Sequence, residues 1–241
     1  MRFNLFVAQR SGLSRRKADA LIQEGKVKLN GKVVITPFLQ VADSDTVEFE
    51  GETLKAQKKI YIIFNKPKGV TTTLSDKFAE KTVLDCLPPE FKGVFPVGRL
   101  DKDSKGLLIL TNDGDFCHRL THPKFEVEKE YLADVMGNVT ADDCRKALHG
   151  IEDEGDILKV KRIKLLKNEN GASVCAVTVC EGKKRHIRRI FRALGHMVCD
   201  LKRVRIGALM LSKMKAGEYM DVGFTTVSKA LKKFNPVKKR Y

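Results

Sequence analysis

The sequence predicts an α+β protein in which a small α/β module precedes a larger domain with a mixed, mainly antiparallel β-sheet and flanking helices. Three features predict this class: short β-prone runs recur at hairpin spacing, amphipathic helical segments interrupt them, and the composition becomes β-rich near residue 60. Regular strand–helix alternation would instead favour a doubly wound parallel sheet. With 241 residues, 42% of them hydrophobic, the chain can form one large and one small core.

The N-terminal module is expected to combine a helix with a hairpin. In "LSRRKADALIQEG", Ser14 can cap a helix that stops at Gly25. "KVKLNGKVV" predicts two short strands joined by Asn30-Gly31, a dipeptide that favours two-residue hairpin turns. "DTVEFEGETL" alternates as one further strand should. Basic side chains surround these elements: Arg15, Arg16, Lys17, Lys26, Lys28 and Lys32.

The larger domain is expected to begin near residue 60. "KIYIIFN" predicts a strand that ends before Pro67, because proline cannot donate to a sheet ladder. "TVLDCLP" favours a short helix, "GLLILTNDG" a buried strand, and "DFCHRLTHP" a helix that ends at Pro123. "EKEYLADVMG" and "ASVCAVTVCEG" predict strands, and "KKRHIRRIFRALG" predicts an amphipathic helix that stops at Gly195. The expected divisions are a module over 1–50, a linker over 51–59, the larger domain over 60–230 and a basic tail over 231–241.

The formal charge of +16 indicates a polyanionic partner, because Lys and Arg neutralise phosphates and release counterions. This charge is concentrated at the two ends of the chain. Residues 1–34 hold eight basic and two acidic residues, and residues 181–241 hold seventeen and four. Two contact regions on one polyanion are therefore expected.

The composition and the spacing of motifs exclude several other classes of protein. No run of 18 apolar residues predicts a membrane span. The six cysteines form no C-x-x-C pair, which favours reduced thiols in a cytoplasmic protein over a zinc or disulfide framework. No glycine-rich nucleotide motif occurs, so no cofactor is expected.

Asp101, in "GRLDKDSKGLLILTN", lies just before an apolar strand. A carboxylate at such a sheet edge is either a solvated turn former or a functional group. Asp103 completes a D-x-D pair that would suit a metal-dependent nuclease or phosphatase, although no second acidic cluster completes a magnesium site. The spacing leaves these alternatives open.

Arginines crowd the helix expected after residue 182. Arg185, Arg188 and Arg192 are three and four residues apart and share a face, where like charges repel unless anionic groups lie against them. We expect phosphates, a carboxylate or both beside them. His118 and His122, at i and i+4, have no third ligand at informative spacing, so we interpret them as ordinary helix residues and predict no metal site.

Taken together, the motifs resemble a known family. "VGRLDKDSKGLLILTN", "KEYL" and "EGKKRHIRRIFRALGH…LKRVRIG" resemble, in that order, the three main motifs of the RsuA-type bacterial ribosomal RNA pseudouridine synthases. "LSRRKADALIQEGKVKLNGKVV" resembles the S4 RNA-binding domain that usually accompanies them. The resemblance implies a cofactor-independent isomerase that converts a uridine of ribosomal RNA to pseudouridine. It gives a slight preference for the large-subunit (23S) RNA over the small-subunit (16S) RNA, with naked RNA and an assembly intermediate both open as the substrate. A monomer is expected.

The resemblance also implies roles for individual residues. Asp101 matches the catalytic aspartate, and Tyr131 matches an active-site tyrosine whose ring can stack on the target base. Arg188, with Arg189 as the alternative, is expected to pair with Asp101 and keep it ionised. Leu201 is expected in an apolar pocket wall, and His186 stands where the family usually has glutamine. The expected RNA-binding residues are Arg15, Arg16, Lys17, Lys28, Lys32, Arg99, Arg185, Arg189 and Arg192.

Two rival functions remain open at this point. One is a non-catalytic RNA-binding or ribosome-assembly protein, in which replacing Asp101 would leave the biological effect unchanged. The other is the metal-dependent nuclease, whose activity EDTA would abolish. Neither rival accounts for all three motifs.

Overall fold

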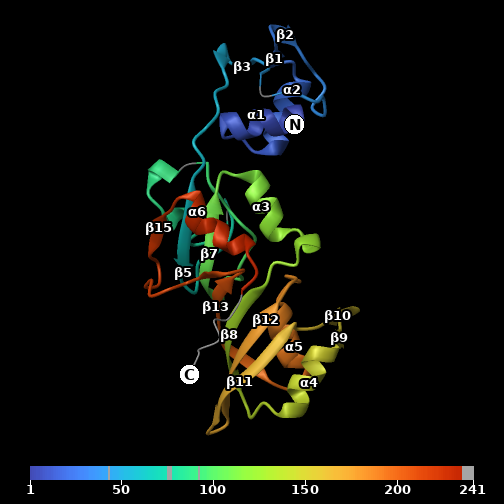
Figure 1. Cartoon of the computed structure of the whole chain (residues 1–241), viewed down its shortest axis with the longest axis vertical. Coiled ribbons are helices and arrows are strands. Elements are labelled where there is room, and N and C mark those ends of the chain that lie inside the picture. The colour runs from blue at the N-terminus through green and yellow to red at the C-terminus, as the bar shows by residue number, and fades with distance from the viewer. Residues whose placement is uncertain (43, 75–77, 92, 235–241) are drawn as a thin grey trace.

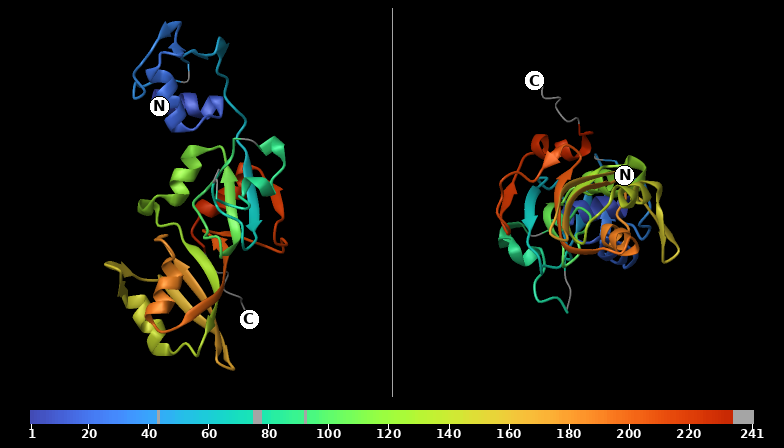
Figure 2. Two further views of the ribbon diagram at one scale, coloured as in Figure 1. Left: turned by 180° about the vertical axis from the view of Figure 1, so that it is seen from behind. Right: turned by 90° about the horizontal axis from the view of Figure 1, so that it is seen from below.

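The computed structural model describes residues 1–42, 44–74, 78–91 and 93–234. The molecule is elongated, with the N-terminal module at one end and a large sheet domain that extends away from it in two parts (Figure 1). The view from behind shows the same order (Figure 2). Most of the basic tail expected over 231–241 lies outside the described residues.

The N-terminal module packs two helices on a four-stranded sheet of order β2-β1-β3-β4. Ser14 caps the predicted helix as expected, because its hydroxyl accepts a hydrogen bond from the Lys17 amide at 3.2 Å. Asn30 and Gly31 both have positive φ, 50° and 78°, and form the predicted two-residue turn. The elements are α1 (Phe3–Ser11), α2 (Arg15–Gln23), β1 (Val27–Leu29), β2 (Lys32–Val33), β3 (Val47–Phe49) and β4 (Glu52–Thr53).

Three features of this module were not predicted correctly. Helix α1 was missed because no side chain caps its start, although Phe3 and Phe6 anchor it in the core. "DTVEFEGETL" forms two strands around a turn at Glu50-Gly51, where both residues have positive φ. Strand β4 therefore lies inside the expected linker, and since Leu54 packs on the module core, the linker is confined to 55–59.

The larger domain is built on a nine-stranded sheet whose main path is β11-β12-β8-β13-β7-β5-β15. Among the described strands only β7 and β13 pair in parallel, which confirms the predicted mixed, mainly antiparallel sheet. The strands of the path are β5 (Tyr61–Lys66), β7 (Lys105–Thr111), β8 (Lys129–Met136), β11 (Arg162–Glu169), β12 (Ala172–Val179), β13 (Met197–Ile206) and β15 (Tyr219–Asp221). Two further short strands, β6 (Phe95–Pro96) and β14 (Leu209–Met210), pair with β7 and β13.

The part of this domain next to the module buries both faces of β5 and β7. On one face Tyr61 and Leu107 pack against helix α3, and on the other Ile62 and Leu108 pack against the segment around Val83 and Val94. Burial on both faces explains why these strands read as continuous apolar runs. The helices and turns of this part are α3 (Gly114–Thr121), α6 (Phe224–Val227), and the 3-10 turns η1 (Leu84–Cys86), η2 (Pro89–Phe91), η3 (Pro123–Phe125) and η4 (Ser228–Leu231). The short helix expected in "TVLDCLP" is thus only the turn η1.

The far part of the domain packs helices on strands β8, β11, β12 and β13 (Figure 1). Helix α5 (His186–Ala193) was predicted, and it buries Ile187, Ile190 and Phe191 in this core as expected. Helix α4 (Ala141–His149) and the hairpin of β9 (Ile151–Asp153) and β10 (Asp156–Leu158) were not predicted.

Gly106 joins the two parts of the sheet, because its strand lies directly against Arg203 of β13. A β-carbon at Gly106 would overlap the Arg203 carbonyl oxygen and lie 2.8 Å from the Arg203 amide nitrogen. Gly106 also has a φ of +107°, which L side chains rarely adopt. Glycine at position 106 therefore allows β7 and β13 to pair this closely, beside the loop that carries Asp101.

Candidate active site

A cavity of about 780 Å³ opens at the junction between the two parts of the sheet domain. Its walls come from the loop before β7, the end of α3, the start of β8, the segment that leads into α5, and β13. The residues important here are Arg99, Asp101, Lys129, Tyr131, Leu201 and Arg203. Three separated motifs of the sequence thus meet in one pocket.

Hydrogen bonds to three successive backbone carbonyls hold the loop that carries Asp101. The Asp101 carbonyl accepts from the Ser104 amide at 3.0 Å, which closes a tight turn over the D-x-D pair. The Thr72 hydroxyl donates to the Leu100 carbonyl at 2.7 Å, and the Gly69 amide donates to the Lys102 carbonyl at 2.8 Å. Asp101 is therefore presented from a fixed loop.

Lys66 lies fully buried behind this loop. Its ammonium donates to the carbonyls of Ser104 and Pro67, at 2.7 and 3.1 Å. Burial lowers the pKa of Lys66 to about 8, although the charges of Asp103 and Asp101 oppose that shift. A positive charge thus lies close to both aspartates. No role was predicted for Lys66 from the sequence.

Asp103 is engaged by two arginines. Arg185 donates two hydrogen bonds to its carboxylate, at 3.0 and 3.2 Å, and Arg188 Nε lies 3.4 Å from it. Burial opposes ionisation of Asp103, but these arginines outweigh it and lower its pKa. A carboxylate already paired with two guanidinium groups is poorly placed to bind a metal ion. This pairing argues against the nuclease alternative.

Arg188 was expected to pair with Asp101, and the structure corrects this assignment. Its guanidinium donates to the backbone carbonyls of Asp103 and Val198, at 3.0 and 2.8 Å, and among the described residues no ion pair joins it to Asp101. Helix α5 points this side chain across the junction toward the loop and not into the pocket. Arg188 therefore ties the loop that carries Asp101 to α5.

Arg189 and Arg192 also differ from expectation, because both form ion pairs within the protein. Arg189 binds Asp153 and Asp156, and Arg192 binds Asp153 and Glu154. These acidic residues belong to the β9–β10 hairpin or its turn, which the sequence analysis had not placed. For these two arginines the anionic partners are thus carboxylates of the protein itself.

Tyr131 is held at the pocket by Arg203. The Arg203 guanidinium carbon lies 5.9 Å from the centre of the Tyr131 ring, and Nη1 donates to its hydroxyl at 3.4 Å. Arg203 is itself fixed, because its Nε donates to the Leu107 carbonyl at 2.7 Å. Its Nη2 is buried without a hydrogen-bond partner. Arg203 lies in the "LKRVRIG" part of the third motif, but no role was predicted for it.

The remaining predicted residues divide between the pocket and the module. Leu201 is buried in the pocket wall as expected, and Arg99 is exposed on the pocket lining. His186 also lines the pocket, where its Nε2 lies 3.0 Å from the Lys159 carbonyl and burial lowers its pKa. The five predicted basic residues of the module are all exposed: Arg15, Arg16, Lys17, Lys28 and Lys32.

Lys129 is a further pocket residue that sequence reasoning missed. Its ammonium donates to the Cys180 carbonyl at 3.4 Å. Burial lowers the pKa of Lys129 to about 8, and the nearby charge of Arg203 acts in the same direction. The pocket therefore contains a lysine whose pKa lies well below its ordinary value.

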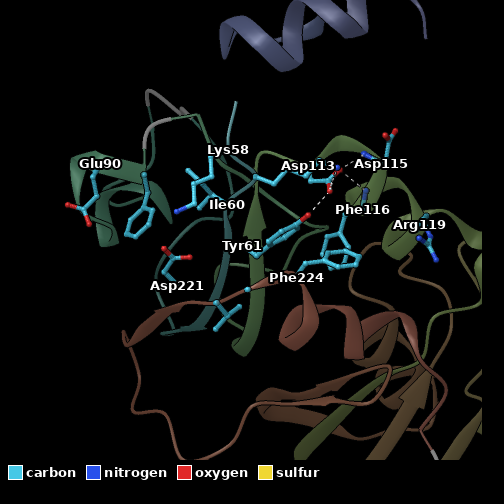
Figure 3. Close-up of a pocket in the computed structure, with 14 residues that line it drawn as sticks. Lys58, Ile60, Tyr61, Glu90, Asp113, Asp115, Phe116, Arg119, Asp221 and Phe224 are labelled. Atoms are coloured by element: carbon cyan, nitrogen blue, oxygen red, sulfur yellow. Dashed lines mark hydrogen bonds and ion pairs between the residues drawn. The ribbon is translucent and has the colours of Figure 1, made fainter. Parts of the chain in front are cut away.

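A second cavity, of about 980 Å³, lies below the N-terminal module (Figure 3). Its polar centre is Asp113, which accepts from the Tyr61 hydroxyl at 2.7 Å, pairs with Lys59 at 2.9 Å and caps helix α3. Tyr61 packs its ring against Phe116 and Phe224. These groups satisfy one another, so this cavity is a structural junction and the Asp101 pocket is the better candidate active site.

Two further observations concern the described residues as a whole. No three of their His, Cys, Asp or Glu side chains are grouped so as to hold a metal ion. No helix within the described ranges has the length and apolar character needed to cross a membrane.

Comparisons with known proteins agree with this geometry. The signature described as "RNA pseudouridylate synthase" matches residues 60–193, and that of the S4 domain matches residues 1–47. The chain belongs to the RNA pseudouridylate synthase family. The resemblance inferred from the three motifs is thus confirmed, and so is the α+β fold with an S4 domain at its N-terminus.

Individual relatives match this synthase over most of their length. A ribosomal large subunit pseudouridine synthase B of Bacillus subtilis (strain 168) is 38% identical over 92% of this chain and 91% of the relative. A protein of the same name from Vibrio cholerae serotype O1 is 34% identical over 89% of this chain and 69% of the relative. A solved structure described as "Crystal structure of pseudouridylate synthase" has a TM-score of 0.68 and 30% identity, over 95% of this chain and 99% of that one.

Proposed function

We propose that this synthase converts one specific uridine of ribosomal RNA to pseudouridine, that this uridine lies in the large-subunit RNA, and that Asp101 is the catalytic carboxylate. The observation that carries the proposal is the pocket in which Asp101 lies with Tyr131 and Leu201 at the junction of the sheet. The names of the relatives in Bacillus subtilis and Vibrio cholerae support the large-subunit assignment.

The chemistry needs a carboxylate but no oxidant or energy source. The N1–C1′ bond of the uridine breaks, the uracil turns, and C5 forms a bond to the same C1′. The proton lost from C5 balances the proton gained at N1. Asp101 begins the reaction either by attack on C1′ or C6, or by abstraction of a proton to give a glycal.

The neighbours of Asp101 hold the base in place for this reaction. Tyr131 stacks on the uracil, and Arg203 fixes the orientation of Tyr131 from behind. Leu201 supplies an apolar wall. The target base must leave its stack in the RNA to enter the pocket, at a cost of about a few kcal/mol. Stacking on Tyr131, worth about 1–3 kcal/mol, offsets part of that cost.

Two basic regions bind the RNA backbone in this proposal. The exposed basic residues of the S4 domain hold the RNA at one end of the molecule, and Arg99 and Arg185 contact phosphates at the pocket. All of these groups come from one chain, so we propose that a monomer is active.

The test uses large-subunit and small-subunit ribosomal RNA transcribed without modification, incubated with the protein in EDTA. Pseudouridine is then mapped by carbodiimide adduct formation and primer extension. The expected result is a single new stop in the large-subunit RNA that disappears with Asp101→Asn, a nearly isosteric change. A stop retained by Asp101→Asn would refute the catalytic role of Asp101.

Two other outcomes identify the rival functions. RNA fragments that form only without EDTA would indicate a metal-dependent nuclease. Equal RNA binding by both proteins without any new stop, on naked RNA and on ribosomal particles alike, would indicate a non-catalytic assembly factor.

A further inference from the structure

Three aromatic side chains gather at the end of helix α3 and in the turn η3: His118, His122 and Phe125, here called the α3 ring cluster. The ring centres of His118 and His122 are 4.9 Å apart, and Phe125 meets them edge-on at 5.8 and 6.2 Å. All three side chains are exposed, Phe125 at 42% of its surface. The cluster is therefore not part of a core.

The local backbone holds these rings in place without RNA. His122 Nδ1 accepts a hydrogen bond from the Lys124 amide at 3.2 Å, which fixes the imidazole over the start of η3. The Phe125 amide donates to the His122 carbonyl at 3.1 Å, and Pro123 restricts the backbone between them. A ligand that stacks on these rings would meet a surface already formed, so little conformational entropy is lost on binding.

Charges around the cluster favour an anionic partner. The Lys124 ammonium lies 4.9 Å from the centre of the Phe125 ring, and Arg119 is exposed on α3 between the two histidines. Glu126, which follows Phe125, is the one acidic residue within the stretch from 118 to 126. Exposed rings interleaved with cations are the combination that binds single-stranded nucleic acid.

The cluster continues directly from the Asp101 pocket. Leu120, Thr121 and Pro123 line the pocket, and they alternate along the chain with the residues of the cluster. A β-carbon at Gly98, three residues before Asp101, would lie 3.6 Å from the Thr121 side chain. The residues of the cluster therefore flank residues of the pocket wall. The end of helix α3 lies beside the junction of the two parts of the sheet (Figure 1).

A metal site is the other reading of two histidines at i and i+4. His122 Nδ1 is already occupied by the Lys124 amide, and no third ligand joins the pair among the described residues. The geometry points instead to stacking.

We propose that the α3 ring cluster is a stacking platform for a nucleobase next to the target uridine in the RNA strand. When the uridine leaves its stack, the neighbouring base loses a stacking partner. The cluster replaces that partner just beyond the pocket, and Lys124 contacts the adjacent phosphate. This inference rests on the proposed function, because it assumes that the uridine enters the pocket of Asp101.

The test compares Phe125→Ala and the double variant His118→Ala/His122→Ala with Phe125→Tyr, which keeps an aromatic ring. Leu148→Ala is the matched control, because Leu148 has the same 42% exposure but lies on α4, in the far part of the domain. The probes are unmodified large-subunit RNA, for kinetics, and single-stranded RNA 12-mers that carry 2-aminopurine on either side of a central uridine, for binding.

The expected result for the two alanine variants is a rise in KM on the order of tenfold with kcat within about twofold, as loss of one stacked base implies. The quenching of 2-aminopurine fluorescence on binding is lost as well. Phe125→Tyr and Leu148→Ala behave like the wild type. Phe125→Ala leaves the salt dependence of RNA binding unchanged, whereas Lys124→Ala reduces its slope by about one phosphate contact.

The two measurements, pseudouridine formation on large-subunit RNA and 2-aminopurine fluorescence on the 12-mers, distinguish failure of this inference from failure of the proposed function. If the wild type forms pseudouridine and quenches 2-aminopurine, and Phe125→Ala does both equally well, the platform is refuted and the activity stands. If the wild type forms no pseudouridine, the proposed function fails, and the fluorescence arm still decides whether a base stacks on the cluster. Normal RNA binding by the alanine variants, with loss of binding to a ribosomal protein, would assign the cluster to a protein partner and overturn the proposal.

Discussion

The guanidinium of Arg188 donates a 3.0 Å hydrogen bond to the backbone carbonyl of Asp103, two residues after Asp101. A second hydrogen bond, of 2.8 Å, runs from the same group to the Val198 carbonyl. One side chain therefore connects helix α5, strand β13 and the loop that carries Asp101. Its position is internal, with 11% of the side chain exposed.

This arrangement predicts that Arg188→Lys impairs catalysis more than binding. A lysine has a single ammonium and cannot bridge both carbonyls in the fixed geometry of a guanidinium. A small displacement of a catalytic group can reduce the rate by about 100-fold, so we expect kcat to fall by about 10- to 100-fold with little change in KM. Steady-state pseudouridine formation provides the measurement. Arg192→Lys is the control, because 60% of the Arg192 side chain is exposed, and its kcat should remain near that of the wild type. Equal losses of kcat in both variants would contradict the role of Arg188 in holding the loop that carries Asp101.

Gly106→Ala is expected to destabilise the protein strongly. Its β-carbon would overlap the backbone of Arg203 where the two parts of the sheet pair, and backbone atoms cannot rotate away as a flexible side chain can. We expect a loss of about 3 kcal/mol or more in the free energy of unfolding, or failure to fold. Denaturant unfolding followed by circular dichroism measures this. Gly182→Ala is the control, since a β-carbon there meets nothing within 4 Å; an unchanged midpoint for Gly106→Ala would refute the argument.

Arg185 and Arg189 should have different roles, although both were expected to bind RNA. Arg189 is paired with Asp153 and Asp156, so Arg189→Gln should lower the midpoint of thermal unfolding and leave RNA affinity nearly unchanged. Arg185 is also paired, with Asp103, but 45% of its side chain is exposed and it lines the pocket, whereas only 10% of the Arg189 side chain is exposed. Arg185→Gln should therefore weaken RNA binding and reduce the slope of its salt dependence by about 1. Filter binding at several salt concentrations distinguishes the two. A reduced salt slope for Arg189→Gln would restore its expected role in RNA binding.

The activity should decline above about pH 8. Burial lowers the pKa of Lys129 to about 8, so the ammonium is charged at neutral pH and loses its proton as the pH rises through that value. The pocket then has one positive charge fewer for the RNA backbone, and KM should rise. Lys129→Met should have a raised KM already at pH 7 and a flatter profile between pH 7 and 9. If the variant retains the full alkaline rise in KM, another group is responsible; Lys66, with a pKa also lowered to about 8, is the next to test.

Local features of the fold were predictable from the sequence because they depend on neighbouring residues. The Ser14 cap, the Asn30-Gly31 turn and the buried strands β5 and β7 all follow from patterns of a few residues. The position of Asp101, in a motif just before β7, was predictable for the same reason. The elements missed, such as helix α1 and the β9–β10 hairpin, lack strong local signals and are held by tertiary contacts.

The partners of the charged side chains could not be predicted in this way. Arg188 forms a hydrogen bond with Asp103, which is 85 residues away in the sequence, and Arg189 forms one with Asp153, which is 36 residues away. A run of arginines shows that negative charge must lie nearby, but it does not distinguish a phosphate of the substrate from a carboxylate of the protein. The sequence therefore determined the family, the buried strands β5 and β7, and the position of the loop that carries Asp101. The tertiary structure decided which cations are paired internally and which remain exposed, because a charge interacts with whatever the fold places within a few ångströms of it.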